Sequence, residues 1–171
     1  MTYSYAKQLR RARTKTLHLR NRQRVRSVNL KLLRQIALSL LEDSLSVQSF
    51  ELGIHLVDTA QITPLNEHFL HHAGSTDVIT FNYAGQSNAH ALEGDVIICV
   101  TDAVAQARHF GTTWQSELVR YLVHGVLHLQ GHDDATAAGR RKMKRQEDRL
   151  LEQLGRLFPL RGLAIAKERH S

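Results

Sequence analysis

Two histidines four residues apart are the residues of this chain best suited to chemistry. His124 and His128 stand in the segment His124-Gly-Val-Leu-His128-Leu-Gln-Gly131-His-Asp-Asp134. On an α-helix, residues four apart lie about 40° apart around the axis and about 6 Å along it, so both imidazoles project from one face. Imidazoles that converge in this way are typical zinc ligands. The pair therefore predicts a metal site.

The third ligand of this site is expected to come from the turn after the helix. Gly131 can end the helix because glycine adopts the left-handed backbone of a C-terminal cap at little cost. Asp134 can then swing back towards the imidazoles, and the spacing His-x3-His-x2-Gly-x2-ligand is that of the elongated metzincin zinc motif. We therefore favour Asp134. His132 is the alternative third ligand, although a continuous helix would place it about 80° round from His124.

Three protein ligands around one ion leave a position open for water or substrate, as catalytic zinc sites require. Zinc is the leading candidate because imidazole and carboxylate ligands suit it. Nickel, copper and manganese are the alternatives. Metalloproteases keep a glutamate after the first histidine as general base, whereas this chain has Gly125. The segment thus indicates a metal site without the base for peptide hydrolysis. Candidate catalytic residues are His132 and Asp133, and Glu117 is a further candidate for the general base.

The charge of the chain predicts a polyanionic partner. The 171 residues include 23 Lys and Arg against 16 Asp and Glu, a net charge of +7. Basic residues gather in residues 1–26, which contain no acid, and again between Arg140 and Arg145. Such clusters suit nucleic acid first and an anionic membrane second, although each is also compatible with a solvated tail or helix face. An arginine-rich tail without acids also resembles an organellar transit peptide.

Length and composition otherwise predict a cytoplasmic protein. A chain of 171 residues fits one domain with a core of its own. The single cysteine, Cys99, excludes an internal disulfide and fits a small core residue in a reducing compartment. No apolar run approaches the roughly 18 residues of a membrane span, and no apolar stretch follows the N-terminal charges as in a secretory signal. We therefore expect no membrane partner.

Apolar periodicity predicts strands and helices that must position the metal site. Strands are expected at residues 16–21, 52–57, 78–81 and 94–100. Helices are expected at residues 30–41, from 63 to about 70, at 102–110, from 112 or 113 to 129, and at 136–155. The helix that carries His124 and His128 is apolar on most sides, so we expect it to be central. Irregular alternation of these elements favours the α+β class, with a small mixed four-stranded sheet packed with about five helices.

The predicted domain organisation is a single catalytic domain between two tails. The domain is expected to span residues 16–156. Before it, residues 1–15 form a basic and flexible N-terminal tail, because they are polar, charged and poor in apolar side chains. After it, residues 157–171 form a C-terminal tail.

The segment from His124 to Gly131 resembles the signature of the YbeY family of metal-dependent endoribonucleases, which act in ribosomal RNA maturation. Further similarities follow in the family's order along the chain: Leu56-Val57-Asp58 with Leu65-Asn66, residues 76–81, and residues 92–98. The resemblance covers about residues 16–154. It implies an α+β fold with a small sheet, one zinc ion, cleavage of single-stranded RNA and association with the small ribosomal subunit.

Two positions depart from the pattern of the family. Its third zinc ligand is usually a histidine, where this chain has Asp134. Its helix after the second strand usually carries an arginine that acts on the phosphate, where this chain has Leu70; His68, His71 and His72 are candidates to replace it. The resemblance implies a zinc-dependent, single-strand-specific endoribonuclease of small-subunit 3′-end maturation and ribosome quality control. The alternative is a non-catalytic, zinc-containing factor for ribosome assembly or RNA binding.

Overall fold

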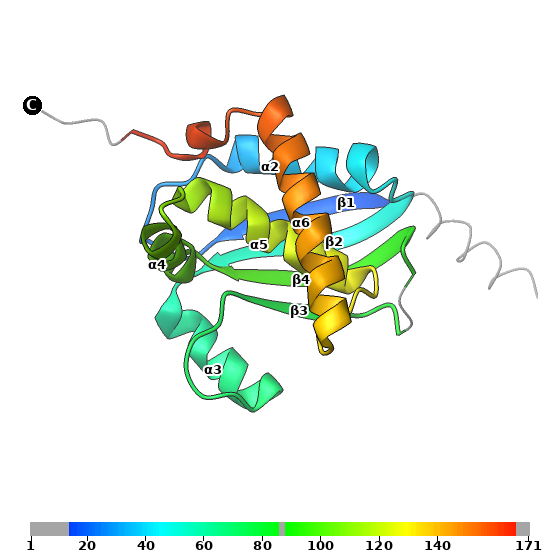
Figure 1. Ribbon diagram of the computed structural model, residues 1–171, viewed down its shortest axis with the longest axis horizontal. Helices are drawn as coiled ribbons and strands as arrows, with labels where there is room; N and C mark the ends of the chain where they lie inside the picture. Colours follow the sequence, from blue (N-terminus) through cyan, green and yellow to red (C-terminus); the bar gives the residue numbers. More distant parts are fainter. Residues whose placement is uncertain (1–13, 86–87, 167–171) are drawn as a thin grey trace, which may run out of the picture.

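The predicted strands form one mixed sheet, and the helices pack mainly on one of its faces. The computed structural model describes residues 14–85 and 88–166. Figure 1 shows the elements, which are β1 (Lys15–Asn21), α2 (Leu30–Ser39), a π-helical turn (Leu40–Ser44), β2 (Ser49–Val57), α3 (Thr59–Leu70), β3 (Val78–Asn82), β4 (Ala91–Cys99), α4 (Val100–Phe110), α5 (Trp114–Leu129), α6 (Ala137–Leu157) and a 3-10 turn (Leu160–Leu163). The predicted α+β class, with a mixed four-stranded sheet and five α-helices, is confirmed for the described residues.

The order of strands in the sheet is β1-β2-β4-β3. β2 pairs in parallel with β1 and with β4, while β3 runs antiparallel to β4 at the edge. Along β2, Leu52, Ile54 and Leu56 point into the main core and are each 1% exposed. This spacing of two follows from the pleat of a strand, which turns successive side chains to opposite faces.

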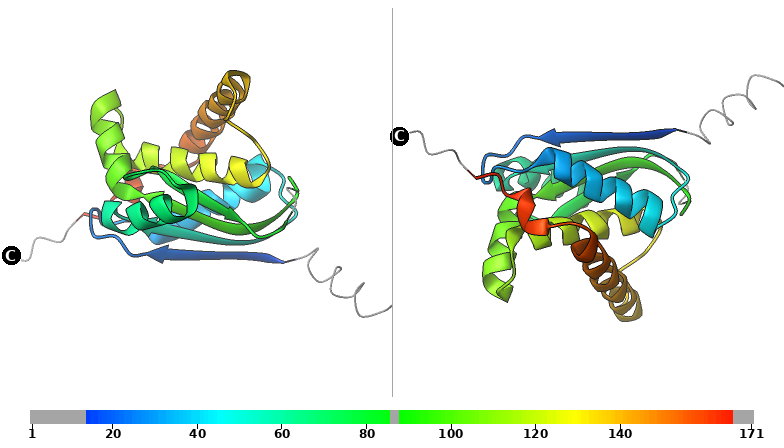
Figure 2. Two further views of the ribbon diagram at one scale, coloured as in Figure 1. Left: turned by 90° about the horizontal axis from the view of Figure 1, so that it is seen from below. Right: turned by 90° about the horizontal axis from the view of Figure 1, so that it is seen from above.

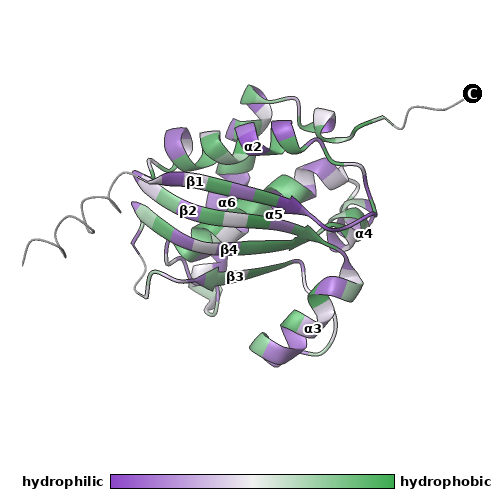
Figure 3. Cartoon of the chain, turned by 180° about the vertical axis from the view of Figure 1, so that it is seen from behind, coloured by the Kyte–Doolittle hydropathy of each residue, from purple (hydrophilic) through white to green (hydrophobic). Residues whose placement is uncertain are grey.

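The two faces of the sheet have different neighbours. α2, α5 and α6 lie on one face (Figure 2), where Leu122 and Leu150 belong to the main core. Val57 and Cys99 point to the other face, and α3 packs against them through Ile62 at the carboxyl ends of β2 and β4. Figure 3 views this second face and shows hydrophilic and hydrophobic residues interspersed along β1 and β2. Cys99 is fully buried, as predicted for a small core residue.

α5 is the central helix, as predicted. It buries eleven of its sixteen residues, and α6 crosses over it (Figure 1). Gly125 brings its backbone directly onto β4, because a Cβ there would lie 2.5 Å from Val96 Cγ1. No helix within residues 14–85 and 88–166 combines the length and apolar character needed to cross a bilayer.

Several predicted helix ends were wrong; α4, for example, begins at Val100 rather than at residue 102. α3 begins at Thr59 rather than at residue 63, because Asp58 and Gln61 form a capping box. The Asp58 carboxylate accepts from Gln61 N, and the Gln61 side chain accepts from Asp58 N, both at 3.0 Å. α6 ends at Leu157 and contains Gly155, which was expected to stop it.

The ends of the described chain are tied to the domain. Lys15, expected within the N-terminal tail, is the first residue of β1, and residues 1–13 lie outside the described residues. Leu163, expected within the C-terminal tail, is fully buried in the main core. Its carbonyl accepts from Asn29 N at 2.8 Å, and Val28 and Ala164 form a β-bridge. This part of the expected tail therefore packs against the start of α2.

Candidate metal centre

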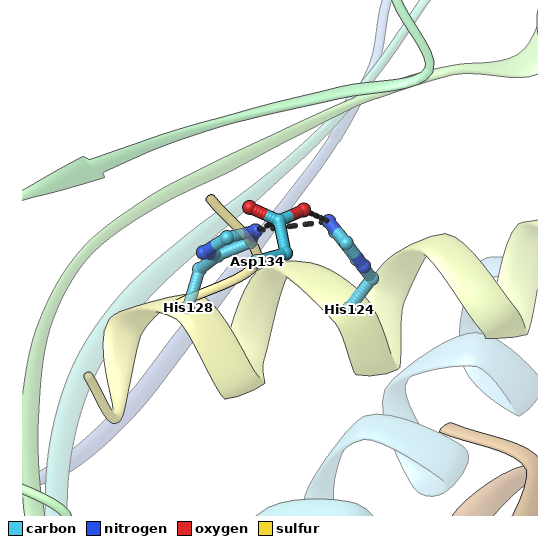
Figure 4. A group of neighbouring side chains, drawn as sticks. All are labelled: His124, His128 and Asp134. Carbon is cyan, nitrogen blue, oxygen red and sulfur yellow. Dashed lines mark hydrogen bonds and ion pairs between the residues drawn. The ribbon is translucent and has the colours of Figure 1, made fainter. Parts of the chain in front are cut away.

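The structure brings together the three residues favoured as metal ligands. His124 and His128 project from one face of α5, and Asp134 reaches them from the turn before α6 (Figure 4). The two Nε2 atoms are 2.9 Å apart. Asp134 Oδ2 lies 3.8 Å from His124 Nε2 and 3.6 Å from His128 Nε2. These separations place three potential ligand atoms around one point.

The geometry of this group suits a small divalent ion. Ligand atoms about 2.0–2.1 Å from a tetrahedral zinc ion lie about 3.3 Å from one another, and the observed separations of 2.9 to 3.8 Å bracket that value. Two imidazoles and one carboxylate are a donor set that zinc accepts. The side chains of His124, His128 and Asp134 are 21%, 26% and 41% exposed, so the group is open to solvent.

The turn after α5 holds Asp134 in place. Gly131 adopts a φ of +96°, a left-handed conformation that glycine reaches without steric cost, and its N–H donates to His128 O at 2.9 Å. Thr136 then caps α6, with its hydroxyl accepting from Gly139 N. Gly139 lets the first turn of α6 approach closely, because a Cβ there would lie 2.3 Å from the backbone oxygen of Asp133. The turn and the start of α6 are thus one packed unit.

The Nδ1 atom of His124 faces a carboxylate of α6. It hydrogen-bonds to Glu147 Oε1, and Glu147 Oε2 lies 3.7 Å from Arg120 Nη1. Burial by itself lowers the pKa of His124, but the hydrogen bond and the negative charge of Glu147 outweigh it, so the pKa lies above its usual range. For His132, burial together with the charges of Lys142 and His128 lowers the pKa.

A cleft of about 500 Å³ opens beside His124 and Asp134. α6 contributes basic residues to its lining, and the last residue of α4 contributes an aromatic one; the lining residues that carry these groups are Phe110, Arg140 and Lys144. Phe110 is 67% exposed. A hollow of about 600 Å³ beside the amino ends of β2 and β4 contains none of the candidate residues, so we assign the chemistry to the smaller cleft.

The other catalytic candidates occupy different places. Glu117 lies buried in the lining of the cleft, where it accepts from Thr112 Oγ1 at 2.7 Å. Asp133 is exposed, and its carboxylate accepts from Ala135 N. His132 is partly buried and lies outside the group of three ligand atoms.

The residues expected to replace the family arginine do not enter the cleft. Leu70 ends α3 with 43% exposure. His68, His71 and His72 are exposed around the same helix end, and His71 adopts a φ of +55° as the C-cap. None of these four belongs to the described lining of the cleft.

Glu147 is a residue of this site that sequence reasoning missed. The signal for it lies in the spacing of α6, where Met143, Leu150 and Leu154 are buried. Glu147 comes four residues after Met143 and three before Leu150, so helical periodicity places its carboxylate on the apolar face. A charged side chain on the apolar face of a helix is costly to bury unless a group of opposite charge or a hydrogen-bond donor pairs with it.

Comparison with known proteins gives consistent similarities. The family model described as Endoribonuclease YbeY matches residues 18–155. The Endoribonuclease YbeY of Salinibacter ruber is 35% identical over 106 residues, covering 58% of this chain and 68% of that protein. The Endoribonuclease YbeY of Petrotoga mobilis is 31% identical over 135 residues, covering 78% of this chain and 92% of that protein. A solution structure from Thermotoga maritima shares the fold, with a TM-score of 0.61 and 21% identity over 91% of this chain and 99% of that chain.

Proposed function

Because this chain belongs to the family described as Endoribonuclease YbeY, we propose that it is an endoribonuclease that cleaves single-stranded RNA with one zinc ion. The observation that supports the proposal most directly is the convergence of His124, His128 and Asp134 at the edge of a cleft whose lining includes Arg140 and Lys144. Metal ligands and phosphate-binding cations are thereby available to the same bound strand.

His124, His128 and Asp134 would hold the ion, beside the cleft that His124 and Asp134 line. Such an ion would polarise a phosphoryl oxygen or lower the pKa of a bound water to about 7. The carboxylate of Asp134 contributes a negative charge that a third neutral imidazole would not. We therefore expect a weaker Lewis acid than a site with three histidines would give.

The cations of α6 would hold the sugar–phosphate backbone. Arg140 donates to the backbone oxygens of Asp134 and Ala135 at 3.3 and 3.0 Å, which holds its guanidinium beside the turn that carries Asp134. Lys144 lines the same cleft and is 72% exposed. Contacts of this kind neutralise phosphates without reading the sequence of bases. In our proposal they take the role of the arginine that Leu70 replaces.

The cellular role is the less direct part of the proposal. We propose that the RNA is ribosomal, that the protein works with the small ribosomal subunit in 3′-end maturation and ribosome quality control, and that it does so in the cytoplasm. The net charge of +7 supports an RNA partner. The names of the relatives support the nuclease activity and extend no further.

The test is cleavage of an end-labelled single-stranded RNA by the full chain loaded with zinc. His124→Ala and His128→Ala are expected to lose bound metal and cleavage together, while His109→Ala, an exposed histidine of α4, keeps both. Chelation should abolish cleavage by the wild type. Undiminished cleavage by the metal-free protein would contradict the proposal.

A second candidate function is that of a non-catalytic zinc-containing factor for ribosome assembly. The absence of a cation at Leu70, where the family has its arginine, favours it. The same experiment distinguishes the two, because such a factor would bind the RNA with zinc present and leave it intact.

A further inference from the structure

α6 places a carboxylate on its buried face. Met143, Leu150 and Leu154 are each at most 2% exposed, and the side chain of Glu147, on the same face, is 12% exposed. Removing an ionised carboxylate from water costs several kcal/mol unless it is paired. The contacts of Glu147 must therefore account for its place among apolar residues.

Both oxygens of Glu147 face groups of α5. Oε1 accepts from Nδ1 of His124, and Oε2 lies 3.7 Å from Nη1 of Arg120. Arg120 in turn donates to Asp148 Oδ1 at 2.7 Å. Arg120 and His124 are four residues apart, so they are neighbours on one face of α5. Glu147 lies across these two side chains, with one carboxylate oxygen towards each of them.

The contact determines which nitrogen of His124 faces the ligand group. A neutral imidazole carries one proton, and a carboxylate that accepts from Nδ1–H leaves Nε2 with its lone pair free. Nε2 is the atom that lies 2.9 Å from His128 Nε2 and 3.8 Å from Asp134 Oδ2. Among the described residues, His124 is the one histidine of the pair with a carboxylate bonded to Nδ1.

We propose that Glu147 is a positioning residue that holds His124 in the orientation and tautomer required to bind the metal ion. The inference rests on the proposed function, in that it takes the three-residue group as the metal site. It also gives α6 and the turn before it one role each at that site. Asp134 precedes the N-cap Thr136 and supplies a ligand, while Glu147, three turns along, supports a ligand of α5 from behind.

Three variants of the full chain test this role. Glu147→Leu removes the acceptor while keeping a buried side chain, and it is expected to lower zinc affinity about 10- to 100-fold, the usual effect of losing such a partner. Glu147→Gln keeps a carbonyl oxygen for Nδ1–H, so its loss should be clearly smaller. Glu152→Gln is the matched control, because it removes an exposed acid of α6 that pairs with Arg156, one turn along the helix, and contacts no histidine; its affinity should stay close to that of the wild type.

Two measurements report on these variants. Competition with a chromophoric chelator gives the affinity for Zn²⁺. In the metal-free protein, ¹⁵N NMR of the imidazoles at a pH where they are neutral should show His124 protonated at Nδ1 in the wild type and in Glu147→Gln, and a mixture of tautomers in Glu147→Leu. The signal of His109, an exposed histidine of α4, serves as the internal reference.

Unchanged zinc affinity in Glu147→Leu, or equal losses in Glu147→Leu and Glu147→Gln, would overturn the inference. If Glu147→Leu lacks the circular dichroism of the folded protein, Glu147→Ser, which is too short to reach His124, takes its place in the same comparison. A wild-type protein without affinity for Zn²⁺ would refute the proposed metal-dependent function, and the tautomer of His124 would then still test whether Glu147 positions it.

Discussion

The position after the first histidine offers a sharp test of how α5 is packed. Metalloproteases place their general base there, and this chain has Gly125. A Cβ at this position would lie 2.5 Å from Val96 Cγ1 and 3.4 Å from Thr80 Cγ2. Val96 is fully buried in β4, and a β-branched side chain has little rotamer freedom with which to move away. The residue therefore faces the sheet and not the ligand group.

The expected cost of Gly125→Ala follows from two opposing terms. Forcing an extra methyl group into a packed core costs about 1–3 kcal/mol. Replacing glycine by alanine inside a helix raises the free energy of unfolding by about 1 kcal/mol. The net loss of stability is expected to be about 1 kcal/mol, which corresponds to a fall in Tm of about 2–4 °C for a chain of this size. Thermal and urea unfolding followed by circular dichroism measure it.

Making Gly125→Ala in a Val96→Ala variant tests whether the clash with Val96 is the cause of the lost stability. In Val96→Ala the methyl group that causes the clash is absent, so adding Gly125→Ala should leave the helix-propensity gain and raise the stability of that background by up to about 1 kcal/mol. The effect of one substitution is thus expected to change sign with the residue at position 96. An equal effect in both backgrounds, or a stabilising Gly125→Ala in the wild type, would refute the packing argument. By the same reasoning Gly125→Glu should yield misfolded protein and no peptidase activity.

Three further predictions concern the ligands, the cleft and the C-terminal turn. Metal analysis should find zinc lost in Asp134→Ala and kept in His132→Ala, and the reverse result would identify His132 as the third ligand. Replacing Arg140 and Lys144 together with alanine should weaken binding of single-stranded RNA and reduce the slope of log affinity against log salt by about 1.4, as expected for two phosphate contacts; an unchanged slope in a fluorescence titration would place the RNA elsewhere. Leu163→Ala should lower the free energy of unfolding by about 2–5 kcal/mol, whereas a loss near zero would show that the C-terminal turn does not stabilise the domain.

Features that depend on residues close in the chain were predictable from the sequence. The spacing of His124 and His128 along one helix aligns their side chains whatever surrounds the helix. The turn at Gly131, with its positive φ, and the N-cap Thr136 are also local, because a cap or turn is decided by hydrogen bonds within a few residues. Alternating apolar residues likewise indicated the strands, since the pleat of a strand has a fixed period.

A local capping box and a tertiary contact explain why the predicted start of α3 and the predicted end of α6 were wrong. The start expected at residue 63 rested on Pro64, because proline is tolerated in the first turn of a helix. The capping box of Asp58 with Gln61 instead starts α3 earlier and leaves the proline inside the helix. Gly155 suggested a stop, yet the packing of Leu150 and Leu154 in the core carries α6 on to Leu157. Tertiary contacts outweigh the propensity of a single residue, which is at most about 1 kcal/mol for glycine.

The sequence by itself determined the motif, because its histidines, its glycine and its aspartate lie within one helix and one turn. Only the tertiary structure decided what surrounds it. The bond from His124 to Glu147 joins residues 23 apart, and it exists because α6 crosses α5 at that point. The approach of Gly125 to Val96 exists because α5 lies on β4. Such contacts depend on how separate elements pack, and the spacing of residues along one element carries no information about the partner that another element brings.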